Sequence, residues 1–548
     1  MRTPPVWSLL LTFGLSLLFL CSLIGWLQNV HIITNNGMYK SIEAEPWIAD
    51  PGSARLDPSN YLYFPLYGVL ARGLGALGIL NGVAWKQFAY LNAVFASLAT
   101  TFIYFFVHCL TASARGAALA ACFHLGCGYV LLLAVINEDI MPGYMLVLAA
   151  MVLAGLWFDR PTIPRVASVG VLFTVGWLVE WRLMFPTLPA LLLALAVADG
   201  SWRARLRQIA VLLLAIVATA GIVALLWEGH NGAVGLHDLL WTGKGVSTGW
   251  AGLSWDKAWM MLSGVGNYFL IVGGWVDPLS SQRAALPLLL SVLVQAMVLA
   301  SCLVTLWPRR GEPRLRTVAI VFLGALVAGQ VFNLYSQPQD PQMQINVMPW
   351  LAVAWGLTLA ALLPRSRLVA TALAVLSVLP LAWNVGALAR FRDGDTRALA
   401  ALQALERQFP PQSTVFVYWG FEPIATWQYA LWSRTWDWDG KVAIALAPSG
   451  PRFKWIALDA GAIRHPDWTA EQNARTIAHD IDQALDRGYR VVISDVWTWS
   501  RDDLAGQFGA LSAANRADAI YAVLHDNYDA RPVFTDAMAG TYYELRRR

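Results

Sequence analysis

Residues 128–158 read GYVLLLAVINEDIMPGYMLVLAAMVLAGLWF. Two long apolar runs stand on either side of a short polar turn, and that turn contains the adjacent acids Glu138 and Asp139. A helix needs about 20 apolar residues to cross the hydrocarbon core of a bilayer. The pattern therefore predicts two membrane spans with a pair of carboxylates between them.

The composition of the whole chain agrees with a protein that crosses the membrane many times. Of its 548 residues, 57% are hydrophobic and only 14% are charged, whereas soluble proteins carry about 25% charged residues. The 27 tryptophans point the same way, because tryptophan is enriched at membrane–water interfaces. The sequence thus predicts a polytopic α-helical membrane protein. Eleven spans are expected, at residues 7–27, 86–110, 116–136, 141–158, 166–181, 183–198, 208–227, 285–306, 317–335, 345–363 and 368–388.

The positions of lysine and arginine predict the orientation, because cytoplasmic loops carry an excess of both. With the N-terminus in the cytoplasm, thirteen of them fall in short cytoplasmic connections and six in the longer external loops. Residues 257–275 are apolar, but a span there would reverse this distribution, so they are predicted to form an interfacial or re-entrant helix. The thirteen are Arg2, Arg115, Arg160, Arg165, Arg203, Arg205, Arg207, Arg309, Arg310, Arg314, Arg316, Arg365 and Arg367.

This topology divides the chain into two domains in a multi-pass protein of the inner (plasma) membrane. Residues 1–392 form the membrane domain, with external loops at 28–85, 137–140, 228–284 and 336–344. Residues 393–548 alternate between strand-like patterns, at 413–419, 453–458 and 489–496, and helix-like patterns, at 396–409 and 469–488. This alternation predicts an α/β domain with a partly parallel sheet. That domain is expected on the periplasmic or extracellular side.

Glu138 and Asp139 have two interpretations. The turn is too short to lift two carboxylates far from the membrane, and adjacent carboxylates near a low-dielectric surface repel each other unless a cation is close. A divalent metal, an arginine or a cationic substrate would supply that cation. The alternative is an ordinary solvated turn, in which acidic residues are common.

Other polar residues of the predicted external face are candidates for substrate contacts. Arg182 lies at the outer end of a span and suits a phosphate, because its guanidinium stays charged and binds in a fork; its alternative role is a pair with Glu180. The amide-rich stretch around Asp340 suits sugar hydroxyls, or is simply a polar loop. The further candidates are Glu43, Glu45, Asp50, Asp57 and Tyr63 of the first loop, together with Lys244 and Gln339.

The arrangement of these features resembles the GT-C superfamily of membrane glycosyltransferases, which use polyprenyl-phosphate sugars. The shared features are an N-in membrane domain, a long acidic first external loop that runs into an interfacial helix, a short second external turn with paired acids, and a C-terminal external domain. The resemblance covers about residues 1–390 by architecture, and its motif content is limited to the two acidic loops.

The resemblance implies transfer of a sugar from a polyprenyl-phosphate carrier to a hydroxyl of a glycan, lipid or protein at the outer face. Asp50 or Asp57 then matches the catalytic base, and Glu138 with Asp139 matches a pair that binds Mg²⁺ or Mn²⁺ or positions the substrate. A metal-independent variant is the other possibility. The alternative functions are a ligase or polymerase of lipid-linked oligosaccharides, and a transporter or flippase. No nucleic-acid partner is expected.

Overall fold

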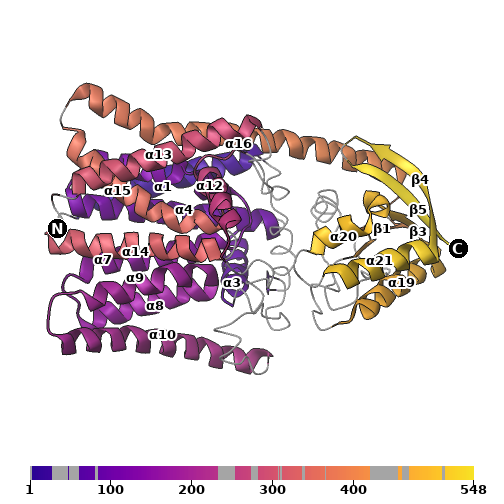
Figure 1. The fold of residues 1–548 in the computed structure, drawn as a ribbon, viewed down its shortest axis with the longest axis horizontal. Coiled ribbons are helices and arrows are strands. Elements are labelled where there is room, and N and C mark those ends of the chain that lie inside the picture. The colour runs from indigo at the N-terminus through magenta and orange to yellow at the C-terminus, as the bar shows by residue number, and fades with distance from the viewer. Residues whose placement is uncertain are drawn as a thin grey trace.

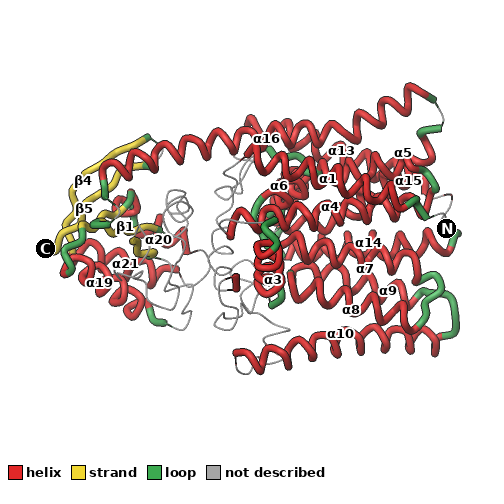
Figure 2. The backbone as a smooth tube through the Cα atoms, turned by 180° about the vertical axis from the view of Figure 1, so that it is seen from behind, coloured by secondary structure: helices red, strands yellow, loops and turns green. Residues whose placement is uncertain are grey.

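The computed structural model describes most of the chain. The described residues are 3–27, 47–48, 61–79, 84–231, 253–272, 282–306, 308, 311–335, 338, 340–364, 366–410, 412–419, 454–458, 468–508, 513–537 and 539–548. Within them a bundle of helices is joined to a small domain that contains a sheet (Figure 1, Figure 2).

The bundle is built from helices that coincide with the predicted spans. Among the described residues, eight helices are long and apolar enough to cross a membrane, nine if one bent pair is counted as a single span, and two further apolar helices are shorter. Each of the eleven predicted spans corresponds to one of these helices or to the bent pair. They are α1 (Val6–Leu27), α4 (Ala84–Thr111), α5 (Ala114–Gly126) with α6 (Gly128–Val135), α7 (Ile140–Trp157), α8 (Ile163–Val179), α9 (Met184–Ala196), α10 (Trp202–Asn231), α13 (Gln282–Leu306), α14 (Pro313–Tyr335), α15 (Met348–Leu362) and α16 (Arg367–Gln408).

The bent pair is held by one buried asparagine. The axes of α5 and α6 differ by 69°, which leaves backbone carbonyls without their helical partners at the break. Asn384 of α16 donates to the carbonyl oxygen of Gly126 at 2.7 Å and to that of Phe269 at 3.0 Å, and it accepts from the backbone N–H of Ile271 at 2.8 Å. The break is therefore a fixed part of the fold.

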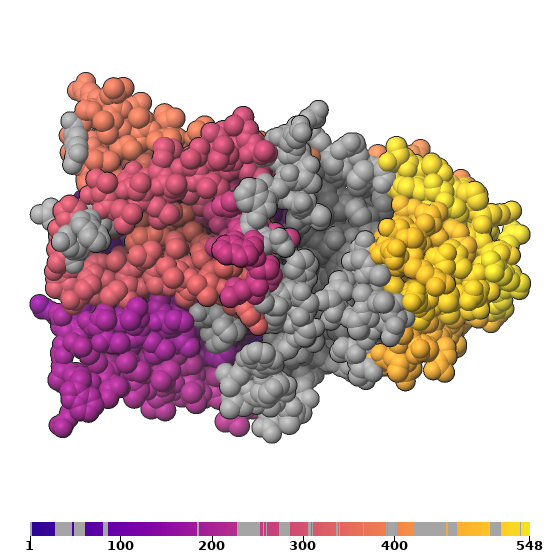
Figure 3. All heavy atoms as spheres, viewed as in Figure 1, coloured from indigo at the N-terminus to yellow at the C-terminus, as the bar shows by residue number. Residues whose placement is uncertain are grey.

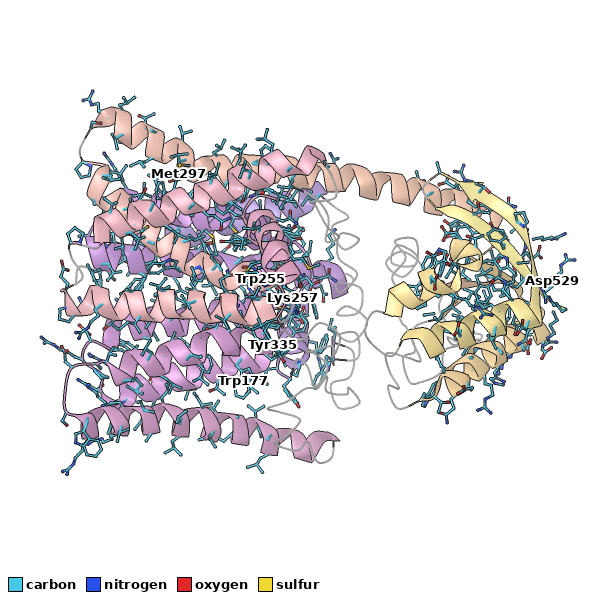
Figure 4. All side chains as sticks on the ribbon, viewed as in Figure 1. Trp177, Trp255, Lys257, Met297, Tyr335 and Asp529 are labelled. Atoms are coloured by element: carbon cyan, nitrogen blue, oxygen red, sulfur yellow. The ribbon has the colours of Figure 1, made fainter. Side chains whose placement is uncertain are left out.

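Two helices at one end of the bundle do not have the length of a span. Helix α12 (Trp255–Phe269) has 15 residues, about 22 Å at 1.5 Å per residue, whereas the hydrocarbon core is about 30 Å thick. Lys257 of α12 donates to the carbonyl oxygen of Tyr335 at 2.7 Å (Figure 4). Helix α3 (Tyr63–Ala76) has 14 residues and matches the interfacial helix expected at the end of the first external loop.

Helix α16 joins the bundle to the C-terminal domain without interruption. It has 42 residues and is about 63 Å long at 1.5 Å per residue, and it runs from the bundle to the sheet (Figure 1). The sequence instead predicted a span at 368–388 and a separate helix at 396–409. One glycine, Gly394, lies between those two segments, and a single glycine costs a helix only about 1 kcal/mol.

The C-terminal domain contains a five-stranded sheet in the order β2-β1-β3-β5-β4. The first three strands are parallel, and β5 and β4 are antiparallel to their neighbours, so the predicted partly parallel sheet is present. The strands are β1 (Thr414–Tyr418), β2 (Lys454–Ala457), β3 (Arg490–Ile493), β4 (Tyr528–Asp536) and β5 (Gly540–Arg547). The helices are α19 (Ala470–Asp486), α20 (Arg501–Phe508) and α21 (Ala513–Asn527).

Both faces of this sheet are covered, and the sequence of β1 shows why. Its side chains alternate between two cores, as a strand requires. Val415 and Val417 pack with residues of α19 and α21, while the ring of Phe416 lies 5.9 Å from that of Phe409, just beyond the end of α16. The end of the long helix is thus fixed to the sheet by aromatic contacts.

The bundle has two ends of different composition. We call the end that faces the C-terminal domain the domain end, and the end where α1 begins the distal end (Figure 1). The turn between α6 and α7, the turn between α8 and α9, and helix α3 all lie at the domain end.

Candidate functional site

The acidic turn at the domain end is buried. Glu138 is 0% exposed and Asp139 is 2% exposed, which excludes the solvated turn that the sequence left open. Carboxylates are almost never fully buried unless they are paired, so the turn must be considered together with the charges around it.

Arg182 supplies a positive charge beside this turn. It lies on the 3-10 helix η2 (Trp181–Leu183) between α8 and α9. Its Nη2 is 3.1 Å from Oδ1 of Asp139, 2.8 Å from Oε2 of Glu180, and its Nε is 2.6 Å from Oε1 of Glu180. Glu180 is 0% exposed and holds the guanidinium by two parallel hydrogen bonds, which fix its plane.

The backbone around Glu180 brings these groups together. Helix α8 ends at Val179, and Glu180 adopts an extended conformation in which its carboxylate accepts a hydrogen bond from the backbone N–H of Arg182 at 3.1 Å. Helix α7 approaches closely at Gly143, where an added Cβ would lie 2.6 Å from the Cβ of Glu180. Any larger residue at position 143 would push the Glu180 carboxylate away from the turn.

Asn92 of α4 holds the backbone of the acidic turn. Its Nδ2 donates to the carbonyl oxygen of Ile136 at 2.6 Å and to that of Glu138 at 2.7 Å. Its Oδ1 accepts a hydrogen bond from the hydroxyl of Tyr67 on α3. Asn92 is 0% exposed, so one amide ties helix α3 to the turn that carries Asp139.

Helix α3 covers the cluster with aromatic rings. The ring of Tyr63 lies 4.5 Å from that of Tyr67 and 5.9 Å from that of Phe88. Burial, and then the negative charge of Asp139, raise the pKa of Tyr67 well above its ordinary value, so its hydroxyl stays protonated and donates. The hydroxyl of Tyr63 is buried and makes no hydrogen bond within the described residues; its predicted contact with substrate stays a prediction.

Asp340 approaches the cluster from the connection between α14 and α15. Its Oδ1 accepts a hydrogen bond from the backbone N–H of Gln342 at 2.8 Å. Burial raises the pKa of Asp340 to about 6, against the opposing effects of that hydrogen bond and of the positive charge of Arg182. Asp340 and Arg182 therefore lie close enough to influence each other's charge.

Three side-chain amides of α14 and of the following connection support the backbone and each other. Gln330 donates to Oε1 of Gln344 at 2.7 Å, Asn333 donates to the carbonyl oxygen of Met343 at 3.0 Å, and Gln344 donates to that of Pro338 at 3.3 Å. These contacts account for Gln344 of the connection and for Gln330 and Asn333 of α14, whereas the predicted contact of Asp340 with a sugar remains a prediction.

Several predicted site residues lie outside the described part of the chain. They are Glu43, Glu45, Asp50, Asp57, Lys244 and Gln339. Within the described residues, no three His, Cys, Asp or Glu side chains group as metal ligands. Glu138 and Asp139 alone are an incomplete ligand set. The predicted Mg²⁺ or Mn²⁺ site would therefore need further ligands from residues outside the described part of the chain.

The sequence missed two residues of this cluster and named a third only as an alternative. Asn92 and Tyr67 lie in aromatic and apolar helical segments, and nothing in those segments indicates that they meet a turn more than forty residues away in the chain. Glu180 was considered as a partner of Arg182, and the structure shows that pair. The available signal was an acidic residue, Glu180, two residues before an arginine at the end of a predicted span.

Comparison with known proteins identifies the fold. No protein-family model matches the chain, and no curated protein sequence matches it. Among solved structures it is similar to the crystal structure of ArnT from Cupriavidus metallidurans in the apo state, with a TM-score of 0.55 and 13% sequence identity, over 96% of this chain and 97% of that chain. The chain therefore has the same overall fold as that ArnT structure.

Proposed function

We propose that this protein transfers a sugar from a polyprenyl-phosphate carrier to an acceptor hydroxyl at the domain end of the bundle. The observation that carries the proposal is the buried cluster of Glu138, Asp139, Glu180 and Arg182. Strongly coupled buried charges are typical of sites that bind or react. The GT-C fold, shared with ArnT, supports the same reaction class.

The reaction requires two kinds of group. The bond between the anomeric carbon and the phosphate oxygen breaks, a bond to the acceptor oxygen forms, and polyprenyl phosphate leaves. A carboxylate must take the proton of the acceptor hydroxyl, and a cation must stabilise the leaving phosphate. The buried cluster offers the cation, and the carboxylate that takes the proton would come from the first loop.

Arg182 is our candidate for the phosphate. Nε and Nη2 of its guanidinium are engaged by Glu180 and Asp139, whereas Nη1 makes no hydrogen bond within the described residues. Its side chain is 17% exposed, and we propose that Nη1 takes the phosphate. The two carboxylates would then orient the guanidinium for the phosphate.

The base and the metal remain as the sequence predicted them. Asp50 or Asp57 of the first loop would take the acceptor proton, and helix α3 would hold that loop over the acidic turn. Trp47 supports this arrangement, because this first-loop residue packs directly against Gly68 of α3. Stimulation of transfer by added Mg²⁺ or Mn²⁺ is the test of a metal.

The side of the membrane and the carrier follow from the same proposal. Sugars outside the cytoplasm arrive on lipid carriers, so a cluster at an outer face would use a polyprenyl-phosphate donor. The excess of arginine at the distal end supports placing that end in the cytoplasm. The likeness to ArnT supports a transferase over a transporter.

Binding of undecaprenyl phosphate to the purified protein tests the donor half of this proposal. We expect the wild type to bind it, Arg182→Lys to bind it more weakly, and Arg182→Ala to bind it most weakly, since Ala loses both charge and fork. Undecaprenol, which lacks the phosphate, is the control ligand. Equal affinity of all three proteins for undecaprenyl phosphate would mean that Arg182 does not bind the phosphate and only forms a structural pair with Glu180.

Turnover tests the reaction itself. A panel of undecaprenyl-phosphate-linked sugars is incubated with the protein and with membrane extract as acceptor, and release of undecaprenyl phosphate is measured. We expect release from at least one donor only when the acceptor is present. Binding of the donors without any release would contradict the transferase and favour a flippase.

A further inference from the structure

The distal end of the bundle carries a group of arginines that the proposed function does not use. Four of them lie on the first two turns of α8 and α10, and a fifth lies in the turn before α8. These are Arg160, Arg165, Arg203, Arg205 and Arg207, and we call them the distal arginine cluster. Within the described residues, none of the five has a carboxylate partner, although the neighbouring Arg314 and Arg316 pair with Asp159 and Asp199.

The fold brings these five residues together. Helices α8 and α10 run side by side in the same direction, since Gly170 of α8 lies against Leu212 and Ala215 of α10. At their beginnings, Nε2 of Gln208 donates to the carbonyl oxygen of Pro161 at 3.3 Å. The first turns of both helices, and the arginines on them, therefore share one corner of the bundle (Figure 1).

This corner is positive and presents its charge to the surroundings. Four of the five arginines are exposed and Arg205 is half-buried. The guanidinium carbon of Arg165 lies 5.8 Å from the ring centre of Trp157, and that of Arg203 lies 5.6 Å from the ring centre of Trp202. The positive ends of two parallel helix dipoles add to the same field. The corner thus favours a negatively charged group.

An apolar surface begins where the charges end. Along α10, Leu214 is 69% exposed, Val217 is 65% exposed and Leu225 is 70% exposed, and this helix forms the edge of the bundle (Figure 3). Trp202, which is 65% exposed, is the first residue of α10 and stands beside Arg203, and tryptophan favours the boundary of a membrane. A ligand that fits both parts has a negative head and long apolar chains.

We propose that the distal arginine cluster, together with the exposed side of α10, binds an anionic phospholipid. The phosphate of the headgroup lies among the arginines, and the acyl chains lie along α10. A soluble anion would use only the first part of this surface, and an uncharged lipid only the second. The site is at the opposite end of the bundle from the acidic turn, so it is independent of the proposed transfer reaction.

Binding of defined lipids to the full-length protein in detergent tests the proposal. Phosphatidylglycerol and phosphatidylcholine are titrated separately, and bound lipid is measured by native mass spectrometry. Each arginine near an anionic lipid surface strengthens binding about fivefold. We therefore expect Arg203→Gln, Arg205→Gln and Arg207→Gln together to weaken binding of phosphatidylglycerol on the order of a hundredfold.

A matched variant controls for the loss of charge alone. Arg407, Arg475 and Arg487 are exposed residues of the chain's C-terminal part, and their combined change to glutamine removes the same charge far from α10. This control should keep the affinity of the wild type for phosphatidylglycerol. The single change Arg207→Gln, at an exposed position, should weaken it about fivefold and guards against misfolding of the triple variant.

Three results would overturn the proposal. The first is equal affinity of the wild type for the two lipids, and the second is an equal loss in the control variant. The third is binding of glycerol phosphate, which has the headgroup chemistry without the chains, as tightly as phosphatidylglycerol. Selective binding of phosphatidylglycerol that only the α10 variants lose would support it.

Discussion

The two ends of the helical bundle differ in the burial and pairing of their charged side chains. At the domain end, Glu138, Asp139 and Glu180 are 0%, 2% and 0% exposed and surround Arg182 in a fixed geometry. At the distal end, the arginine cluster is mostly exposed and lacks carboxylate partners within the described residues. Removing one partner of a buried pair leaves an uncompensated charge, whereas exposed charges are solvated by water. The comparison teaches that similar substitutions at the two ends should have very different consequences.

The largest effect is expected from Asp139→Asn. This change keeps the shape of the side chain and removes the negative oxygen that contacts Arg182. Removing a group that takes part in proton transfer or positions the reactants costs about 10²–10⁴-fold in rate. We expect a loss of that order in the release of undecaprenyl phosphate, and the same for Glu138→Gln.

Asp159→Asn is the matched control at the other end. Asp159 also pairs with an arginine, Arg314, at 3.2 Å, but at the distal end. Its variant should transfer sugar at the rate of the wild type. An equal loss of transfer rate in Asp139→Asn and Asp159→Asn would contradict a special role of the domain end in transfer.

The next effect concerns stability. Glu180→Gln leaves the guanidinium of Arg182 without its main carboxylate partner, and breaking a buried pair in this way costs about 3–5 kcal/mol. Asp199→Asn breaks the exposed pair with Arg316 and should leave the melting temperature within the error of the measurement. Thermal unfolding in detergent compares the two variants. A similar small shift in both would mean that the Glu180 pair is not stabilising the domain end.

Asn92 should produce a smaller but diagnostic effect. Asn92→Asp removes the two hydrogen bonds to the carbonyl oxygens of Ile136 and Glu138, and each buried acceptor left unsatisfied costs about 1–3 kcal/mol. Tyr67→Phe removes only the hydrogen bond that the Tyr67 hydroxyl donates to Oδ1 of Asn92. We expect Asn92→Asp to lower both melting temperature and transfer more than Tyr67→Phe. Equal effects would show that the link to α3, and not the support of the turn, is what matters.

The smallest effect is a dependence of the melting temperature on pH that comes from Asp340. Its pKa is raised to about 6 in the folded protein, above the value of about 3.9 in an unfolded chain. The stabilising contribution of the protonated carboxyl is thus complete below the unfolded value and is lost as the pH rises through about 6. Asp340→Asn cannot ionise. The melting temperature of the wild type should therefore fall relative to this variant between about pH 4 and about pH 7, and parallel curves would contradict the shifted pKa.

The spans and the type of C-terminal domain could be predicted from the sequence because both depend on local patterns. A run of apolar residues predicts a span wherever it occurs, and the alternation in β1 and the Thr469 cap of α19 are equally local. The helix boundary near residue 393 was wrong, because a single glycine does not end a helix whose two halves are both stable. Strands β4 and β5 were not predicted, since their exposed and half-buried side chains give a weaker pattern.

The candidate site was less predictable for a physical reason. Glu138, Asp139 and Arg182 stood out because charges are rare among apolar spans. Asn92 and Tyr67 are neutral residues whose role depends on which helices pack together, and that information is spread over the whole chain. Their burial distinguishes them only after the fold is known.

The measurement that tests the central claim most directly is the position of the two ends relative to the membrane. Ser413 lies at the start of the C-terminal domain and Ser201 at the distal end, and both are exposed. Each is changed to cysteine and treated with a membrane-impermeant maleimide, with the parent protein as background for its own cysteines. We expect Ser413→Cys to be labelled in intact cells and Ser201→Cys only after lysis. The reverse pattern would place the buried carboxylate cluster at the cytoplasmic face and contradict transfer from a lipid-linked donor at the outer face.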